Sequence, residues 1–475
     1  MELKSLLTAD YNRNIQTIDS HMRVNSSFDL VGRNVILASR KAKIYFVDGF
    51  CKDDVMVKIL APLMSLDEAK INAHKGIRTF ADAFVPYIET DVVNDVQRFE
   101  KMVLSGGIGV VVEGFSEALL IDARTYPARA VGEPENDRVL RGPHDGFVET
   151  IVFNTALIRR RIRDVNLTME AFCVGSKSQT DVVVCYLNGK VNTKALENVR
   201  KKLSSVSINS LTMSQQSLIE CLVPKQRLNP FPKVRYTERP DAAAASVLEG
   251  SIIILTDNSP AAMIVPSGIF DFLQDTNDFY MSPLIGSYLR IVRMLVFALT
   301  ILMVPTWFLL IQNPEFIPPW LNFLKIEEPN DMPVIVQLFV VEIVIDALRL
   351  ASINTPNALS SSFAVVGALV LGEFAVSAGW FVPEVVLYMA FVAISNFAQP
   401  SFELGYAFKL FRMMMIALTA LLNVWGYVAG LIIIALEIAF NKTVTGQSFL
   451  YPLVPFNARA LLNLLFRLPI SKKNN

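Results

Sequence analysis

The sequence has few of the residues that enzymes and metal centres need. It contains only four cysteines and three histidines in 475 residues. The histidines, His21, His74 and His144, lack metal-ligand spacing, and the cysteines match no zinc or redox motif. The sequence also lacks a Gly-x-Ser-x-Gly motif, a kinase motif set and a phosphate-loop lysine. We therefore expect that the protein is not an enzyme and binds no metal or cofactor.

Net charge is also missing, since the chain carries 44 basic and 44 acidic residues. Nucleic-acid-binding proteins normally carry a basic excess, so we expect no nucleic-acid partner. Charge is scarce in one part of the chain. The last 185 residues contain ten basic and ten acidic residues, whereas the first 290 contain 34 of each. Together with a mean hydropathy of +0.40, this step predicts a soluble domain followed by a membrane domain.

The cysteines and the N-terminus indicate a compartment for the first part. Cys51, Cys173, Cys185 and Cys221 all lie in the first half of the chain, three of them within apolar runs. This pattern predicts buried free thiols in a reducing compartment, and hence a cytoplasmic domain. The first 30 residues contain no apolar segment typical of a signal peptide, so we expect none to be cleaved.

The first part of the chain contains an internal duplication. Val103–Ile121 aligns with Val247–Val265 without a gap, at an offset of 144 residues. In each copy a helix is expected to end at a glycine, and two apolar strands joined by a tight turn follow. The earlier segments Lys43–Gly49 and Val183–Gly189 repeat with an offset near 140. We predict two small α/β subdomains with similar topology.

The predicted fold class is therefore a duplicated pair of α/β cytoplasmic subdomains followed by a polytopic helical transmembrane domain. The expected boundaries are an N-terminal helical or flexible segment at 1–27, a first subdomain at 28–130, a linker and second subdomain at 131–285, a transmembrane domain at 286–440 and an amphipathic cytoplasmic tail at 441–475.

Five apolar segments in the second part are candidates for membrane spans: Met294–Ile311, Val334–Leu350, Leu359–Gly379, Pro383–Ala398 and Met413–Phe440. Arginines before the first segment and acids after it favour a cytoplasmic N-terminal domain. The last run is long for one span, so either it forms a hairpin or one segment is re-entrant. The basic tail favours an even number of crossings with both ends cytoplasmic.

Several charged residues lie within these segments. Glu342, Asp346 and Arg349 are spaced four and three residues apart, which places them on one helix face. A charge in hydrocarbon costs on the order of 2.5–3.5 kcal/mol, so these groups must face protein or water. Two interpretations stay open, a structural ion-pair network and an ion path.

The next segment extends the ion-path interpretation. It is rich in small and polar residues, which suit either close helix packing or the lining of a pore. We take Leu359–Val376 as the candidate pore-facing helix, with Ser361, Ser362, Val365 and Glu373 as candidate path residues.

Two charged clusters lie in the first part. Arg159, Arg160, Arg161 and Arg163 fit a solvated helix face, but we prefer a contact with lipid head groups or with acids of a neighbouring subunit. Arg235, Glu238, Arg239 and Asp241 predict helix capping and an ion-pair network that organises a domain joint.

Three phrases resemble the GerA family, the A subunits of bacterial spore germinant receptors. They are Arg141–Glu149 with the following Asn154–Ile162, then Asn229–Asp241, and finally Gln399–Gly405. The resemblance covers about residues 25–470. The phrases Ala351–Pro356 and Phe381–Tyr388 are similar to those of the family's stage V sporulation protein AF branch.

The resemblance implies a multi-pass protein of the inner spore membrane with its N-terminal domain in the cytoplasm. It also implies a homo-oligomer that contacts membrane lipid and other spore germination membrane proteins. The expected function is an ion-channel or signal-transducing subunit that promotes cation release during germination. The alternatives are a secondary transporter, for which no inverted repeat is visible, and a non-conducting scaffold of a germinant-receptor complex.

Overall fold

The computed structural model describes residues 6–24, 26–124, 141–223, 229–354 and 370–467. It divides into two compact units, each described separately below. The first unit consists of Met1–Lys225, Val234–Pro266 and Val444–Gly446, and the second consists of Gln226–Lys233, Ser267–Thr443 and Gln447–Asn475.

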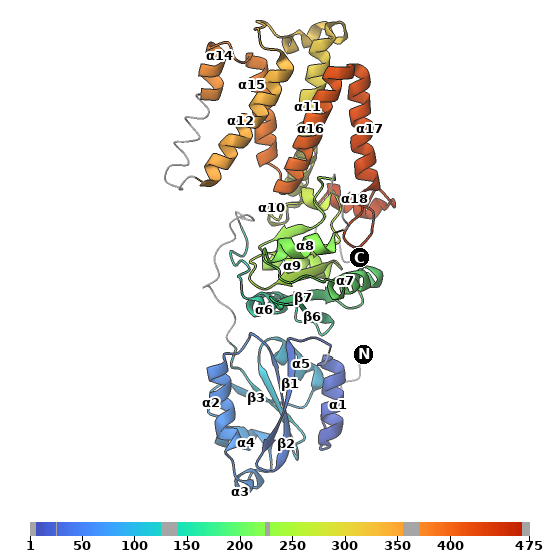
Figure 1. The fold of residues 1–475 in the computed structure, drawn as a ribbon. Helices are drawn as coiled ribbons and strands as arrows, with labels where there is room; N and C mark the ends of the chain where they lie inside the picture. Colours follow the sequence, from blue (N-terminus) through green and yellow to red (C-terminus); the bar gives the residue numbers. More distant parts are fainter. Residues whose placement is uncertain (1–5, 25, 125–140, 224–228, 355–369, 468–475) are drawn as a thin grey trace. The chain divides into compact units, whose positions relative to one another are not determined.

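The first unit begins with a five-stranded antiparallel sheet in the order β1-β2-β4-β5-β3. Figure 1 shows strands β1, β2 and β3 with α1 and α2 on opposite sides of them. Helices α1 and α5 cover one face, and α2, α3 and α4 cover the other, so each face buries an apolar cluster. The elements are α1 (Tyr11–Met22), β1 (Leu30–Leu37), β2 (Arg40–Val47), α2 (Asp53–Met64), α3 (Glu68–Asn72), α4 (Ile77–Phe84), β3 (Thr90–Val93), α5 (Val96–Leu104), β4 (Ile108–Val112) and β5 (Ala118–Ile121).

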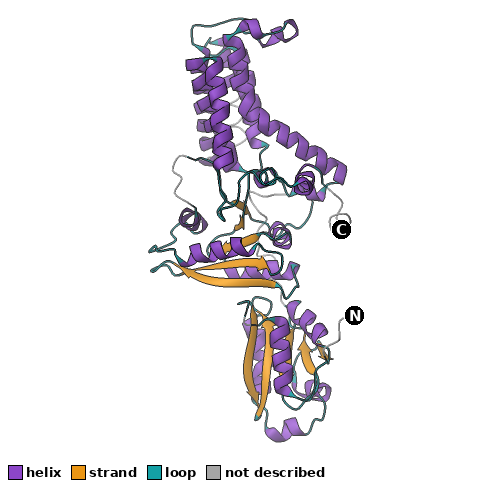
Figure 2. Ribbon diagram, turned by 90° about the vertical axis from the view of Figure 1, so that its right-hand side faces the viewer, coloured by secondary structure: helices purple, strands orange, loops and turns teal. Residues whose placement is uncertain are grey.

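A second five-stranded sheet has the order β6-β7-β9-β10-β8. Helices α6 and α9 pack on one face and α7 and α8 on the other, and Figure 2 shows helices lying against the strands. The elements are α6 (Ile151–Arg161), β6 (Leu167–Val174), β7 (Thr180–Leu187), α7 (Thr193–Ser204), α8 (Gln215–Leu222), β8 (Arg235–Thr237), α9 (Pro240–Leu248), β9 (Ile252–Thr256) and β10 (Ala262–Val265).

The structure confirms the duplication as two antiparallel α/β subdomains, and the strand register is repeated as well. Ala42 pairs with Val112 in the first sheet, and Val182 pairs with Thr256 in the second, at the expected offsets of 140 and 144 residues. Gly106 and Gly250 both have positive φ values, +99° and +101°, directly after equivalent helices. A left-handed residue is therefore required at the same point of both copies.

The repeat extends further toward the N-terminus than expected. Buried Asn14 and Asn154, 140 residues apart, each exchange two hydrogen bonds with the backbone six residues earlier. In the first copy the partner is Thr8, at 2.8 and 2.6 Å, and in the second it is Val148, at 2.8 and 2.5 Å. Helix α1 is thus the counterpart of α6 and packs on the first sheet. The boundary expected at residue 27 falls inside this subdomain.

All four cysteines are free, but the prediction of buried thiols is wrong for two of them. Cys185 is buried, Cys51 is half-buried, and Cys173 and Cys221 are exposed. Cys173 lies on the edge strand β6, where alternate residues point away from the core, and Cys221 lies on the outer side of α8. An apolar run in the sequence does not distinguish the two faces of an element at the edge of a subdomain.

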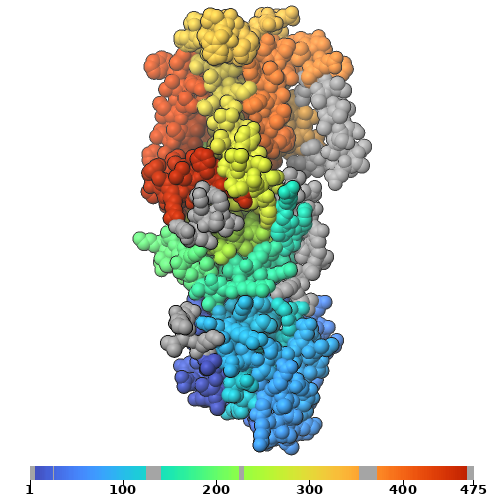
Figure 3. Space-filling model, turned by 180° about the vertical axis from the view of Figure 1, so that it is seen from behind, coloured from blue at the N-terminus to red at the C-terminus, as the bar shows by residue number. Residues whose placement is uncertain are grey.

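The second unit is helical, with its long helices packed as a bundle. Its helices are α10 (Asn277–Tyr280), α11 (Pro283–Gln312), α12 (Val334–Asn354), α14 (Ala375–Ser377), α15 (Pro383–Phe397), α16 (Phe402–Leu422), α17 (Val424–Phe440) and α18 (Ala458–Leu465). Shorter turns occupy Asp271–Leu273, Pro314–Phe316, Pro319–Leu324 and the π-helical Val370–Phe374. Within the bundle α11 contacts both α15 and α16, and it runs between the orange and red segments in Figure 3.

By length and composition, two helices of the described part of the chain, α11 and α16, could cross a membrane. Helices α15 and α17 are apolar but shorter. The predicted long run Met413–Phe440 is divided at Asn423, which has a positive φ of 51°. Helices α16 and α17 then pack against each other, so the run forms a helical hairpin, one of the two alternatives left open by the sequence.

Glycine is required just after this turn. A side chain at Gly426 would overlap the carbonyl group of Leu418 on α16. The turn is also held to the end of α11, because the side-chain amides of Asn313 and Asn423 exchange two hydrogen bonds of 2.6 and 2.9 Å. The hairpin is therefore tightly packed at its closed end.

Candidate functional site

A buried network of charges joins α12 to α16 inside the helical unit. The Glu342 carboxylate accepts from Nε of Arg412 at 2.9 Å and also binds Nη2 of the same residue. Its other oxygen lies 3.1 Å from Nζ of Lys409. Lys409 in turn reaches Asp346 at 2.5 Å, which closes a chain of alternating charges.

The network also includes backbone acceptors. Lys409 donates to the carbonyl oxygen of Glu342 at 3.0 Å, and Arg412 Nη1 donates to the carbonyl oxygen of Thr300 on α11 at 2.9 Å. Two acids thus balance two bases, with three helices involved. Glu342, Lys409 and Arg412 are buried, and a buried charge is tolerated only when it is paired and hydrogen-bonded in this way.

Asp346 is the most accessible member of the network, with 34% of its side chain exposed. It lines a hollow together with Glu342, Arg349, Asn396, Tyr406 and Lys409. The predicted clustering of Glu342, Asp346 and Arg349 on one helix face is therefore observed. The hollow is lined by charged and apolar side chains, and its three bases, Arg349, Lys409 and Arg412, outnumber its two acids, Glu342 and Asp346.

Arg349 has a different environment from the two acids. Its guanidinium carbon lies 3.7 Å from the centre of the Phe402 ring and 5.2 Å from the centres of the Phe397 and Tyr406 rings. Cation–π contacts of this kind suit a charge that is partly removed from water. Arg349 thus has aromatic neighbours from both α15 and α16.

The other predicted path residues do not join this site in the described structure. Glu373 is exposed in the π-helical turn and does not line the hollow. Ser361, Ser362 and Val365 lie outside the described residues, as does most of the candidate pore helix Leu359–Val376.

Among the basic cluster in α6, Arg159 contradicts the predicted lipid or neighbour contact. It is fully buried, and its guanidinium binds both oxygens of Asp29 at 2.7 and 3.0 Å. Arg161 binds Asp145 at 2.6 and 2.7 Å within the same chain. Arg160 and Arg163 are exposed, so an external contact stays a prediction for these two.

The second charged cluster, which contains Arg239 and Asp241, lies at the start of α9. Arg239 is buried and donates to Asp241 at 2.7 Å, and its backbone N–H donates to the Thr237 hydroxyl at 3.2 Å. Asp241 lies in the first helical turn, where an acid complements the helix dipole. The ion pair expected here was among Arg235, Glu238 and Arg239, with Asp241 as a helix cap, whereas the structure pairs Arg239 with Asp241 and has Arg239 itself at the N-cap. Arg235 and Glu238 are half-buried, and the role of the cluster in a domain joint stays a prediction.

Sequence reasoning missed the basic half of the main network. Lys409 and Arg412 are not among the site residues expected from the sequence. Their spacing of three residues places them on one face of α16, as the spacing of Glu342 and Asp346 does on α12. Two charged faces of opposite sign in apolar helices are a signal of helix pairing, and this signal could have identified the network.

Lys233, in one of the phrases that resemble the GerA family, is another buried base in the helical unit. It donates to the side-chain oxygen of Asn441 and, at 3.1 Å, to the carbonyl oxygen of Lys442. Burial lowers the pKa of Lys233 to about 8, although attraction to Glu437 opposes the shift.

This lowered pKa predicts a pH effect on stability. The folded protein releases the Lys233 proton near pH 8, whereas the unfolded chain keeps it up to its ordinary pKa of 10.5. The unfolded state then binds more protons, so stability should rise with pH between these values, by at most about 1.4 kcal/mol per pH unit. We expect Lys233→Met to lack this increase in detergent melting curves at pH 7.5–9.5. The same slope in both proteins would contradict the prediction.

Comparison with known proteins identifies the family. The sequence model of the Bacillus/Clostridium GerA spore germination protein family matches residues 16–475. The chain is 35% identical to stage V sporulation protein AF of Bacillus subtilis (strain 168), over 96% of this chain and 92% of that protein. The chain therefore belongs to the GerA spore germination protein family, and the family predicted from the three phrases is confirmed.

Two further matches are informative. The chain is 29% identical to the uncharacterized membrane protein YfkQ of Bacillus subtilis (strain 168), over 77% of this chain and 72% of that protein. The crystal structure of the N-terminal domain of the A subunit of the Bacillus megaterium spore germinant receptor GerK3 matches 56% of this chain and 98% of that domain, at 24% identity and a TM-score of 0.44.

Proposed function

We propose that this protein is a membrane subunit of the spore germination apparatus that assembles into oligomers and promotes cation release from the spore. Its membership of the GerA family supports a germination role. The observation that supports the cation step is Asp346, a carboxylate with 34% of its side chain exposed at a hollow of an apolar bundle. Because Lys409 already binds Asp346 and Arg349 also lines the hollow, a cation that reaches this carboxylate must replace the Lys409 contact.

Membrane insertion is supported by the surface of the helical unit. Large apolar side chains are exposed on its long helices, which is unfavourable in water and favourable in lipid. They include Leu284, Tyr288, Leu295, Leu387, Ile394, Phe397, Leu410, Leu421, Trp425, Leu436 and Phe440. We propose a location in the inner spore membrane, with the two α/β subdomains in the cytoplasm. One of its relatives is also named a membrane protein.

Oligomerisation follows from the small number of helices. Few spans cannot enclose a pore alone, so several copies are required for conduction. We also expect the protein to contact membrane lipid and other germination proteins. The candidate ion path consists of Glu342, Asp346 and Arg349, with Ser361, Ser362, Val365 and Glu373 from the adjoining segment. One observation favours the alternative of a non-conducting scaffold: the network is already neutral, and Glu342 is fully engaged.

Reconstitution tests the proposal directly. The purified chain is incorporated into vesicles loaded with potassium, and potassium efflux is measured with an ion-selective electrode. Wild-type protein should release potassium faster than empty vesicles. Asp346→Asn should slow release about fivefold, since a nearby unit charge in water is worth about 1 kcal/mol. Glu315→Gln, which removes an exposed acid outside the network, serves as the control and should behave as wild type.

The outcomes separate the alternatives. Wild-type vesicles that retain potassium as well as empty ones would reject conduction by this chain alone and favour the scaffold. Efflux that is equal in wild type and Asp346→Asn would keep conduction but remove Asp346 from the path.

A further inference from the structure

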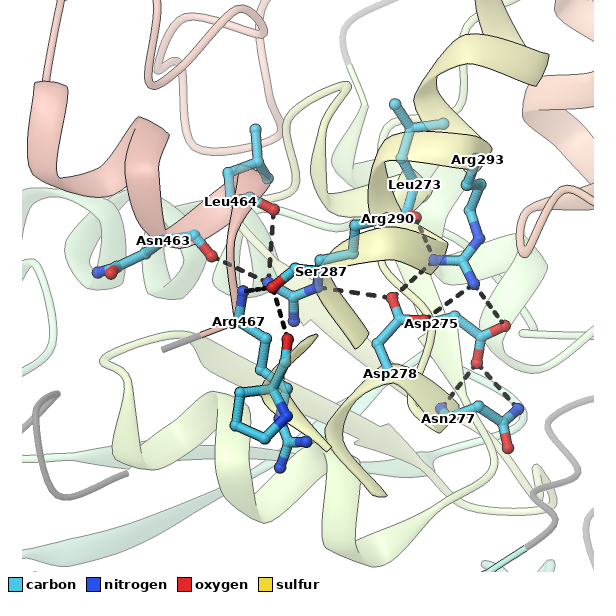
Figure 4. Close-up of polar contacts among 11 residues, drawn as sticks. Leu273, Asp275, Asn277, Asp278, Ser287, Arg290, Arg293, Asn463, Leu464 and Arg467 are labelled. Carbon is cyan, nitrogen blue, oxygen red and sulfur yellow. Dashed lines mark hydrogen bonds and ion pairs between the residues drawn. The ribbon is translucent and has the colours of Figure 1, made fainter. Parts of the chain in front are cut away.

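A second cluster of charges lies where α11 begins, and it contains more positive than negative charge. Arg290 and Arg293 of α11 face Asp275 and Asp278, and Arg467, which follows α18, lies beside Ser287 with its side chain directed away from the two acids (Figure 4). The cluster therefore has an excess of one positive charge. It lies entirely within the helical unit.

The two acids are used mainly by Arg293. Its guanidinium donates to both oxygens of Asp278, at 2.7 and 3.1 Å, to Asp275 at 3.3 Å and to the carbonyl oxygen of Leu273 at 3.2 Å. Arg290 reaches the same Asp278 only at 3.6 Å, which is too long for a hydrogen bond. Asp278 thus accepts hydrogen bonds from Arg293 through both oxygens, whereas its ion pair with Arg290 is longer.

Arg290 is left with donors that lack acceptors. Its Nη1 donates to the carbonyl oxygen of Asn463 at 2.9 Å and lies 3.4 Å from that of Leu464, at the end of α18. The side chain is only 4% exposed, yet Nε and Nη2 have no hydrogen-bond partner among the described residues. Buried guanidinium donors without acceptors are costly, so this position favours an added acceptor.

Arg467 adds a second donor of the same kind. Its backbone N–H binds the hydroxyl of Ser287 at 3.0 Å, which fixes it beside α11, and its buried Nη1 also lacks a partner in the described structure. A Cβ at Gly286 would lie 3.0 Å from Cδ of Arg467. Gly286 is one turn before Arg290 on α11. The Arg467 side chain therefore lies against the face of α11 that carries Arg290.

The position of the cluster favours a lipid ligand. Helix α11 begins here with exposed Leu284 and Tyr288, and α18 has exposed Leu462 next to buried Leu464. An amphipathic helix beside the first turns of a long apolar helix is typical of the head-group level of a bilayer. At this level the abundant acceptor with negative charge is a phosphate, which guanidinium groups bind through several hydrogen bonds.

We propose that Arg290 and Arg467 form a binding site for a phosphate group, supplied by the head group of an anionic phospholipid. The phosphate oxygens accept from Nη2 of Arg290 and Nη1 of Arg467 and neutralise the excess charge. Because both atoms are shielded in this structure, the Arg467 side chain must move aside for the lipid to enter. The choice of a lipid rests on the membrane location proposed above, whereas the phosphate chemistry does not.

The test uses the full chain in a non-ionic detergent after removal of native lipid. Phosphatidylglycerol, phosphatidylcholine or inorganic phosphate is titrated in, and the melting temperature and the lipid retained in native mass spectra are measured. Phosphatidylglycerol should raise the melting temperature and remain bound. Arg467→Gln should weaken its apparent affinity about tenfold. Arg459→Gln removes an exposed arginine of α18 and should not weaken it.

Each remaining outcome has a defined meaning. A saturable shift with inorganic phosphate and none with lipid would keep the phosphate site and reject the lipid as its source. No shift with any ligand, or an equal loss in Arg467→Gln and Arg459→Gln, would overturn the proposal. Because Arg290 also holds α18, Arg467→Gln is the more informative variant. Potassium efflux is not a readout here, so failure of this site and failure of the proposed conduction are distinguishable.

Discussion

Glu342→Gln should lower the stability of the helical unit by about 3–5 kcal/mol, because it leaves Arg412 and Lys409 buried without their shared acid. Both bases approach this one carboxylate, and both are almost fully buried. The measurement is the midpoint of thermal or denaturant unfolding in detergent. Glu373→Gln removes an exposed acid from the same region and should change stability by less than about 0.5 kcal/mol.

A double substitution distinguishes lost pairing from lost packing. Glu342→Gln combined with Arg412→Gln removes one charge of each sign and leaves Lys409 paired with Asp346. The double variant should therefore be more stable than Glu342→Gln alone. A double variant less stable than the single one would mean that Arg412 stabilises the bundle mainly through its contact with the Thr300 carbonyl on α11 and through packing.

Arg159→Met should be comparably severe in the first unit, with an expected loss of about 3–5 kcal/mol. It leaves the Asp29 carboxylate buried without its cation and frees the carbonyl groups of Asp164 and Leu167. The surface pair of Arg98 with Asp91 provides a matched control, since its side chains are 60% and 45% exposed. Arg98→Met should cost less than about 1 kcal/mol.

The effect of Arg159→Met can be measured at single amides as well as by global unfolding. Phe28 and Met169 connect the two subdomains through a backbone hydrogen bond of 3.0 Å, next to the buried pair. Hydrogen exchange of the Phe28 amide should accelerate more in Arg159→Met than that of the amides in the centres of both sheets. Uniform loss of protection would show that the pair stabilises each subdomain and not only the connection between them.

The topology of the first unit was largely predictable from the sequence, because the two copies of the repeat align without a gap. The positions of the strands in one copy therefore give those in the other. Gly106 and Gly250 fix the end of equivalent helices, and the paired segments then fix the strands that follow. The position of α1 was not predictable in this way. Asn14 and Asn154 are single polar residues in helices of different composition, and their equivalence depends on hydrogen bonds to a backbone six residues away.

The candidate site was predictable only in part. The spacing of Glu342 and Asp346 gave the charged face of α12, but its partners are some 70 positions later in the chain, and helix pairing is a tertiary property. For Arg159 the sequence predicted an external contact where the structure has an internal one. A run of arginines suggests an exposed face, yet the first of them is buried because Asp29, 130 residues earlier, lies against it.

The closed end of the α16–α17 hairpin has a mechanical consequence. The backbones are in such close contact at Gly426 that the two helices cannot slide past one another without a clash, so they should move together as one rigid body. Relative displacement within the bundle must then occur where α16 meets α11 and α12. Arg412 bonds to both of those helices, so a movement of the hairpin and the breaking of the buried charge network would be a single event.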